Sequence, residues 1–187
     1  MKCKPYIPGV SALLITVFVM VFMVVPAAHA TDRASFDNLQ AAVQTLSFLE
    51  SLPKEGPIIV GVVYSSDVPT TEALAGETAR IIGTMRGPNP RMLQPLVLST
   101  TNLPQFVGRL DVLFLVTGAS KHAEVIVSVM HRYHLVSISD DLACVDAKCC
   151  VLSVRSGQRV EITLNMALAD AVGARFSRVF TMVVTRK

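Results

Sequence analysis

The stretch Ile58-Ile59-Val60-Gly61-Val62-Val63-Tyr64 decides the fold. It is a short, continuous apolar run rich in β-branched residues, which is typical of a strand buried on both faces of a parallel sheet. Three further runs of this kind lie at residues 96–98, 112–116 and 135–138. The sequence therefore predicts an α/β domain with a mostly parallel sheet.

Helical patterns separate these strands. Apolar residues recur at helical spacing in residues 35–51, 74–82, 103–109 and 120–132. The intervening residues 83–95 contain several prolines and glycines, and we expect a loop there. Strands alternating with helices predict right-handed crossovers, with helices on both faces of the sheet.

The last third of the chain has a different pattern. Residues 150–155 and 159–164 are two strand-like runs separated by Ser156-Gly157-Gln158, which predicts an antiparallel hairpin at the sheet edge. Asn165 is well placed to cap a following helix. The tail, residues 176–184, fits a helix and a strand equally well.

Residues 1–30 have the pattern of a secretory signal peptide. A basic start precedes an apolar stretch from Leu13 to Val25, and Ala28-His29-Ala30 has small residues at the spacing of a cleavage site. Cleavage there would leave residues 31–187, a length suited to one hydrophobic core. We therefore expect an exported, single three-layer domain; retention of the apolar stretch as an anchor is the alternative.

The predicted domain is close to neutral. The chain has 17 Lys and Arg against 14 Asp and Glu, and two of the lysines lie in the leader. Nucleic-acid binding needs clustered cations that displace counterions from phosphates, so the lack of a basic run argues against it. The same observation predicts no polybasic membrane patch. After residue 30, no apolar segment approaches the roughly 18 residues of a membrane-spanning helix.

Three cysteines follow the leader: Cys144, Cys149 and Cys150. Export permits a disulfide. Adjacent residues of an extended segment point to opposite faces, so we expect only one of Cys149 and Cys150 to be aimed at Cys144. A zinc site is the alternative, although the chain has no Cys-x-x-Cys pair and its nearest histidines, His131 and His134, lie some distance back.

Polar residues follow each predicted parallel strand. Ligands of open α/β sheets bind outside the carboxyl ends of the strands, so these loops predict a rim for a small polar solute, as in solute-binding proteins. Helix capping is the alternative, because it needs the same residue types at the same places. The candidate rim residues are Ser65, Ser66, Ser99, Ser120 and Asp140.

No catalytic or metal motif is complete. Gly118-Ala119-Ser120-Lys121 follows a predicted strand, but the Gly-x-x-x-x-Gly-Lys-Ser/Thr pattern of a phosphate loop is absent, and so is a Gly-x-Ser-x-Gly elbow. His131 and His134 share a helix face without a third ligand. Asp140, Asp141 and Asp146 lack the spacing of a calcium loop. We expect a binding module that is not an enzyme and needs no cofactor.

Three segments carry a more specific pattern. They are residues 134–140, Gly157-Gln-Arg-Val-Glu-Ile-Thr-Leu-Asn165 and Ala169-Asp-Ala-Val-Gly173. In order, they resemble the YfiR family of bacterial periplasmic proteins, which has a strand ending in Ser-Asp, a loop, a strand of the form Arg-x-x-Phe-Glu-Ile-Asn and an Ala-rich helix. Earlier segments fit in order, so the resemblance spans nearly the whole predicted domain.

The resemblance implies a function. YfiR-type proteins are periplasmic repressors that bind the periplasmic region of an inner-membrane diguanylate cyclase, and an outer-membrane lipoprotein sequesters them in turn. They look like redox-sensitive homodimers. By this analogy, the protein would lower cyclic-di-GMP and restrain biofilm formation through protein contact, without catalysis.

The family's site residues carry over in part. Arg159, Glu161 and Asn165 match the family strand and become the candidate partner-binding residues. For Glu161 the alternative is a cross-strand ion pair with Arg155 or Arg159. For Asn165 the alternative is the helix cap.

The family's carboxyl-terminal disulfide is best matched by Cys144 with Cys150. The chain departs from the family at Val160, where the family has Phe, and at Leu52-Pro53, where it has Trp-Pro. It also lacks the cysteines of the second family disulfide.

Overall fold

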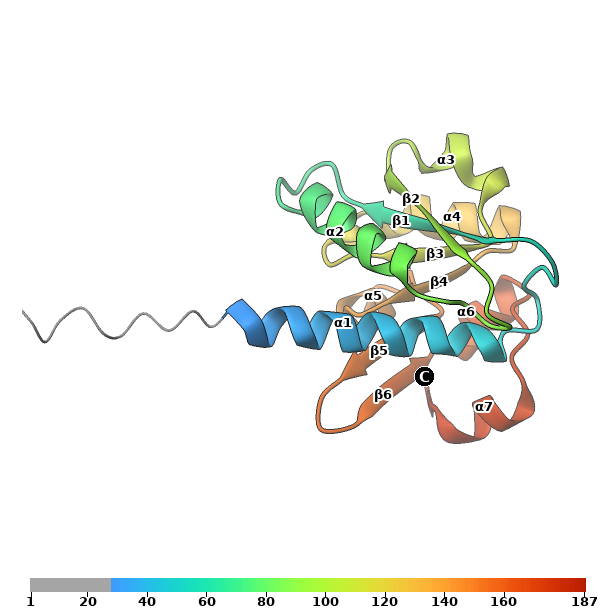
Figure 1. Cartoon of the computed structure of the whole chain (residues 1–187). Coiled ribbons are helices and arrows are strands. Elements are labelled where there is room, and N and C mark those ends of the chain that lie inside the picture. Colours follow the sequence, from blue (N-terminus) through green and yellow to red (C-terminus); the bar gives the residue numbers. More distant parts are fainter. Residues whose placement is uncertain (1–27) are drawn as a thin grey trace, which may run out of the picture.

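A single sheet organises the described part of the chain. The computed structural model describes residues 28–187, with side chains from Phe36 onward. The predicted leader lies outside the described residues except for Ala28-His29-Ala30. Seven strands form one sheet in the order β2-β1-β3-β4-β5-β6-β7 (Figure 1). This confirms the predicted α/β class and its mostly parallel sheet.

β1 (Ile58–Tyr64) is the strand from which the sheet extends in both directions. It pairs in parallel with β2 (Leu93–Ser99) on one side and with β3 (Val112–Leu115) on the other. β4 (Val136–Ser139) and β5 (Leu152–Ser156) continue the parallel ladder beyond β3. Most side chains of β1 are buried, as its continuous apolar run predicts.

Helices cover both faces of the sheet (Figure 1). One face carries α1 (Ala28–Thr45), the 3-10 turn η1 (Leu46–Phe48) and α2 (Thr71–Thr84). The other face carries α3 (Leu103–Phe106), η2 (Val107–Arg109), η3 (Ala119–His122) and α4 (Ala123–Tyr133). Among the helices of residues 28–187, none is long and apolar enough to cross a membrane.

The carboxyl-terminal third contains the predicted hairpin. β5 and β6 (Val160–Leu164) pair antiparallel, and α6 (Met166–Ala171) follows directly. The tail, which the sequence did not decide, forms α7 (Arg178–Val183) and the two-residue strand β7 (Thr185–Arg186). β7 pairs in parallel with β6 and is the last strand of the sheet.

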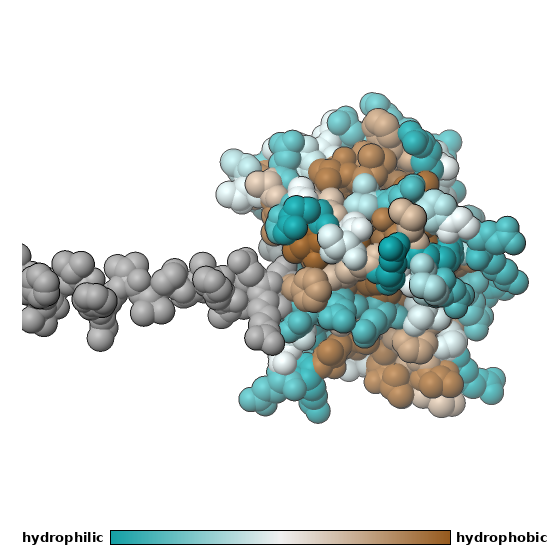
Figure 2. Space-filling model, in the orientation of Figure 1, coloured by the Kyte–Doolittle hydropathy of each residue, from teal (hydrophilic) through white to brown (hydrophobic). Residues whose placement is uncertain are grey.

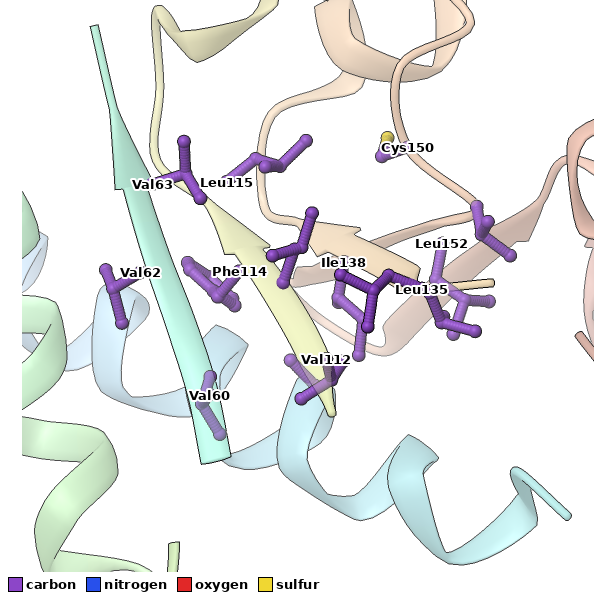
Figure 3. Close-up of a cluster of buried hydrophobic side chains, with 14 of the residues drawn as sticks. Val60, Val62, Val63, Val112, Phe114, Leu115, Leu135, Ile138, Cys150 and Leu152 are labelled. Atoms are coloured by element: carbon purple, nitrogen blue, oxygen red, sulfur yellow. The ribbon is translucent and has the colours of Figure 1, made fainter. Parts of the chain in front are cut away.

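The core is centred on β1, β3 and β4 (Figure 3). Successive side chains such as Val62 and Val63 point to opposite faces of the sheet, and both are fully buried. On one face, Leu39 of α1 and Ile82 of α2 lie close to Val60 of β1. The sheet is therefore covered by apolar side chains on both sides, which explains why a parallel arrangement is stable here.

β2 begins earlier than predicted. The prolines of residues 83–95 suggested a loop, but the strand starts at Leu93 and includes Pro95. β2 is the first strand of the sheet and pairs only with β1. Proline has no N–H to donate, and an edge strand tolerates this because one of its sides needs no ladder hydrogen bonds.

A short helix that the sequence did not predict lies between two parallel strands. α5 (Leu142–Asp146) connects β4 to β5. Its N-cap is Asp141, whose Oδ1 accepts a hydrogen bond from the Ala143 N–H at 2.9 Å. Aspartate at an N-cap is a helix-start signal. The helix that follows is too short to show a periodic apolar pattern in the sequence.

Gly61 allows a close approach between β1 and the segment after η2. A Cβ at this position would lie 2.8 Å from Cδ1 of Leu110 and 3.1 Å from Cδ2 of Leu113. Gly61→Val is therefore expected to lower the free energy of unfolding by about 1–3 kcal/mol, measured by urea denaturation.

Gly76 in α2 provides the matched control, because a Cβ there would meet nothing within 4 Å. Gly76→Ala is expected to raise the free energy of unfolding by about 0.5–1 kcal/mol, since alanine favours the helix. A Gly61→Val protein as stable as the wild type would contradict the tight packing at β1.

Candidate functional site

The loops after four parallel strands, β1 to β4, meet at one edge of the sheet. The chain leaves β1 for β2 on one side, whereas β3 lies on the other side of β1, so β1 is a topological switch point. The Thr100 N–H donates to the carbonyl of Tyr64 at 2.9 Å, and the Val116 N–H donates to the carbonyl of Val63 at 3.1 Å. We call this region the carboxyl edge: residues 65–71, 99–101, 117–122 and 139–141.

A histidine and a carboxylate connect two of these loops. Nε2 of His122 lies 2.9 Å from Oδ2 of Asp67. No aligned hydrogen-bond partner for this buried nitrogen is found among the described residues, so the contact is a close approach without a hydrogen bond. His122 therefore belongs to the loop contacts of the carboxyl edge.

The other two histidines with described side chains lie away from His122. His134 ends α4 with a positive φ of 56°, and its Nδ1 lies 3.1 Å from the carbonyl of Val172. His131 is exposed. Within the part of the chain that the structure describes, no group of three or more potential ligands is placed to hold a metal ion.

Two buried hydroxyls at the carboxyl edge have no protein partner. Ser65 is 0% exposed and Thr100 is 1% exposed, and neither side-chain oxygen makes a hydrogen bond to any residue that the structure describes. An unpaired buried polar group lowers the stability of the folded protein by about 1–3 kcal/mol, so such groups are rare in proteins and each one calls for an explanation. Ser153 shares this condition, but it lies inside β5.

The remaining rim candidates are placed in different ways. Ser66 is exposed, and its Oγ lies 3.4 Å from Oγ1 of Thr101. Ser99 is buried, and its Oγ accepts a hydrogen bond from the Asn102 N–H at 3.1 Å in the turn before α3. Ser120 is half-buried in η3.

The start of α2 holds the loop after β1 in place. Oγ1 of Thr71 donates to the carbonyls of Ser65 at 2.7 Å and Val68 at 2.8 Å. A Cβ on Gly118 would lie 3.5 Å from Cγ2 of Thr71, so the loop after β3 packs against the same side chain. Gly118 has a φ of 90°, which favours glycine. Sequence reasoning missed Thr71, although its place before an apolar helical pattern is a helix-start signal.

Carboxylates dominate the charge near this edge. Burial raises the pKa of Asp140, and the nearby charge of Asp141 adds to the effect against an opposing backbone hydrogen bond. Burial also raises the pKa of Tyr64, with further contributions from the carboxylate of Glu72 in the first turn of α2. The edge is therefore less suited to an anion than its helix N-termini alone would suggest.

The raised pKa of Asp140 gives a pH dependence with a definite sign. The folded protein holds this proton more tightly than the unfolded chain, so the contribution of Asp140 to stability falls as pH rises above its ordinary pKa of 3.8. Asp140→Asn is therefore expected to raise the melting temperature at neutral pH, with a difference from wild type that shrinks toward acid pH. Thermal unfolding across the pH range measures this. A difference that grows on acidification would contradict the environment assigned to Asp140.

The three cysteines are buried free thiols close to one another. Cys144 contacts the thiols of both Cys149 and Cys150. The expectation that only one of these could face Cys144 was wrong, because the pair does not lie in an extended strand. The chain turns at Lys148, whose φ is 56°, and the Cys149 N–H donates to the carbonyl of Cys144 at 2.9 Å.

The pKa values of Cys144 and Cys149 are raised, as is typical of thiols buried in a protein core. The hydrogen bond to Cys144 and burial both raise the pKa of Cys149. For Cys144, the contact with Cys149 lowers the pKa, but the contact with Cys150 and burial outweigh it and raise the pKa overall. The predicted Cys144–Cys150 bond is not formed in the structure, and its formation on oxidation stays a prediction.

The hairpin residues named by the family resemblance do not all lie together. Arg159 and Glu161 are exposed and line an open hollow of about 620 Å³ at the β5–β6 turn, with Glu161 opposite Arg155 in the ladder. Asn165 is only 8% exposed, and its Oδ1 accepts a hydrogen bond from the Leu168 N–H at 3.0 Å. Asn165 is thus the N-cap of α6, as its alternative interpretation predicts, and is not part of the exposed hairpin face.

The cap at Asn165 gives a stability prediction. Asn165→Ala is expected to lower the free energy of unfolding by about 1 kcal/mol, because an amide N–H at the start of α6 loses its partner. Asn102 precedes α3 without a side-chain capping bond, so Asn102→Ala is the matched control and should change little. Chemical denaturation of both variants measures the difference. Equal losses would contradict a specific capping role for Asn165.

Comparison with known proteins identifies the fold. No known family model and no curated protein matches the chain. Among solved structures, a conserved domain protein from Vibrio cholerae matches with a TM-score of 0.56 and 8% identity, over 81% of this chain and 59% of that chain. A ligand-free, open substrate-binding protein with adhesive properties from Clostridium difficile matches with a TM-score of 0.56 and 11% identity, over 73% and 56%.

A third structure is an ABC domain in complex with L-Trp from Streptococcus pneumoniae. Its TM-score is 0.53, with 12% identity, over 82% of this chain and 60% of that chain. At these identities the likeness concerns the fold alone. The chain spans somewhat more than half the length of the structures it matches, and its fold is an α/β fold that also occurs in substrate-binding proteins.

Proposed function

We propose that the protein is a binding module for a small polar solute, which is held at the carboxyl edge. The observation that carries the proposal is the pair of buried, unpartnered hydroxyls of Ser65 and Thr100 at the ends of β1 and β2. A ligand that donates or accepts hydrogen bonds there would satisfy both groups. Two structures of similar fold, one a complex with L-Trp and the other a substrate-binding protein, support a binding role.

The charge of the edge favours a neutral or cationic solute. Asp67, Asp140 and Asp141 lie in the loops, and Glu72 lies in the first turn of α2, where an anion would otherwise be stabilised by the helix dipole. Lys121 is the lysine that the loop after β3 contributes. A ligand with amine or hydroxyl groups therefore fits this edge better than a phosphate.

A thermal-shift screen tests the proposal. Purified residues 31–187 are heated with single compounds: amino acids including L-Trp, polyamines, sugars, nucleosides and, as an anionic arm, inorganic phosphate. Binding to the native state must raise the melting temperature, and the shift must grow with ligand concentration. We expect amines or polyols to produce the shift and phosphate to leave the melting temperature unchanged.

Hydroxyl variants locate the site. Ser65→Ala and Thr100→Val should reduce the ligand-induced shift, because each removes one of the hydroxyls that the ligand would satisfy. Ser153→Ala is the matched control, since it removes an equally buried, unpartnered hydroxyl away from the carboxyl edge. A panel without any active compound, or a shift that survives both variants, would argue against a solute site at this edge.

The regulatory function implied by the YfiR resemblance is the second candidate, and one observation favours it. Arg159 and Glu161 are exposed beside an open hollow, as a partner-binding hairpin requires. In this candidate the protein is periplasmic and contacts an inner-membrane diguanylate cyclase. Crosslinking in cells, with Glu161→Lys as the disabled variant, would test it. Cellular cyclic-di-GMP that is unchanged on deletion of the gene would remove this candidate.

A further inference from the structure

α7 exposes an unusual amount of apolar side chain. Val179 is 69% exposed, Met182 73% and Val183 77%, the highest values among the large apolar residues of the described chain. Figure 2 shows brown, apolar surface along the lower side of the molecule, where Figure 1 places α7. Exposed apolar side chains gathered on one helix mark a contact surface for another body. We call these three residues the α7 face.

Packing beneath the helix forces these side chains outward. Phe180 is 1% exposed, and its ring stacks on Phe48 with centroids 5.0 Å apart and on Phe176 with centroids 5.3 Å apart. Ser177 caps the helix by accepting the Phe180 N–H at 3.4 Å. Val179 lies three residues before Met182 and four residues before Val183, so with 3.6 residues per turn these three exposed side chains share one side of α7.

Basic side chains surround this face in the sequence. Residues 175–187 contain Arg175, Arg178, Arg186 and Lys187 and no acidic residue, whereas residues 36–174 contain more acidic than basic residues. Lys187 pairs with Asp146 at 3.0 Å, while Arg178 and Arg186 are exposed. The sequence showed no long basic run, yet positive charge and exposed apolar surface occur together on this short segment.

The exposed apolar side chains of α7 and the arginines beside them favour one kind of binding partner over others. A symmetric contact between two copies would press together two α7 faces that are each bordered by the exposed Arg178 and Arg186, and like charges would repel. A peptide or protruding side chain would need a hollow, but Val179, Met182 and Val183 protrude. The hollow of about 280 Å³ beside α7 is lined instead by residues such as Phe176 and Thr181. An anionic bilayer surface needs no hollow and is attracted by arginine.

We propose that the α7 face docks the protein on an anionic phospholipid surface. Val179, Met182 and Val183 insert at the headgroup boundary, and Arg178 and Arg186 interact with lipid phosphates. The ring of Phe48 stacks on Phe180 of α7, and Phe48 belongs to η1, which directly follows α1. The carboxyl end of α1 lies at the end of the sheet where β1 begins (Figure 1). Docking through α7 therefore leaves the carboxyl edge, at the other end of β1, accessible, and the inference does not depend on the solute site.

Vesicle co-sedimentation tests the proposal. Residues 31–187 are mixed at low ionic strength with vesicles of equal parts phosphatidylcholine and phosphatidylglycerol, or of phosphatidylcholine alone. We expect sedimentation with the anionic vesicles, weakened by salt because exposed charges are screened. Loss of each arginine should weaken partitioning about fivefold, so Arg178→Gln with Arg186→Gln should weaken it far more than the control Arg109→Gln.

The apolar part is tested separately. Val179→Ser, Met182→Ser and Val183→Ser together should lower partitioning by about tenfold or more, because most of the inserted apolar area is lost. Met92→Ser is the matched control, since Met92 is 58% exposed at a distant loop. All replaced side chains are exposed, and unchanged melting temperatures would confirm that the variants fold.

Any of four results would overturn the proposal. The first is wild-type protein that stays in the supernatant with anionic vesicles. The second is a triple serine variant that partitions like the wild type. The third is a wild type that elutes as a dimer and a triple variant that elutes as a monomer, without vesicle binding, which would assign the α7 face to a second copy. Equal binding to phosphatidylcholine alone would remove the role of the arginines.

Discussion

Burial of β1 on both faces of the sheet is the constraint on which the rest of the structure depends. The strand has neighbours on both sides and helical layers above and below, so its apolar run leaves water almost completely. Gly61 permits this closeness, because a side chain there would meet Leu110 and Leu113. Strands placed on both sides of β1 require that the connecting segments diverge at its end, and the polar loops of the carboxyl edge lie at that point.

At the carboxyl edge, the loops are ordered by side-chain contacts although two buried hydroxyls have no hydrogen-bond partner. Thr71 and Gly118 bring the loops after β1 and β3 into contact, and His122 approaches Asp67 across the same gap. These contacts order the loops without using the hydroxyls of Ser65 and Thr100. These two unpaired, buried hydroxyls are the observation on which the proposed binding function is based.

The carboxyl-terminal segment completes the sheet and creates a surface of another kind. β7 adds to β6, and the stacked rings of Phe48, Phe176 and Phe180 hold α7 in one orientation. α7 has only six residues, and Phe180 is the one that it buries against the core. Val179, Met182 and Val183 therefore remain exposed. The carboxyl edge and the α7 face thus lie at different ends of the same domain. A ligand bound at one of them would not cover the other.

The sequence by itself determined the elements whose signals are local. The apolar runs of β1 and β3, the periodic pattern of α1, the β5–β6 turn and the cap at Asn165 are each specified within a few residues, because strand burial, helix amphipathicity and capping depend on neighbours along the chain. Tertiary structure decided the rest. Pro95 is accepted in β2 because that strand is at the sheet edge, and Cys144 meets both other thiols because of a turn at Lys148. His122 reaches Asp67 only through the pairing of β1 with β3. α7 is oriented by the stacking of Phe180 on Phe48, which lies more than a hundred residues away in the sequence. Contacts of this kind depend on which segments the fold brings together, and no local pattern encodes them.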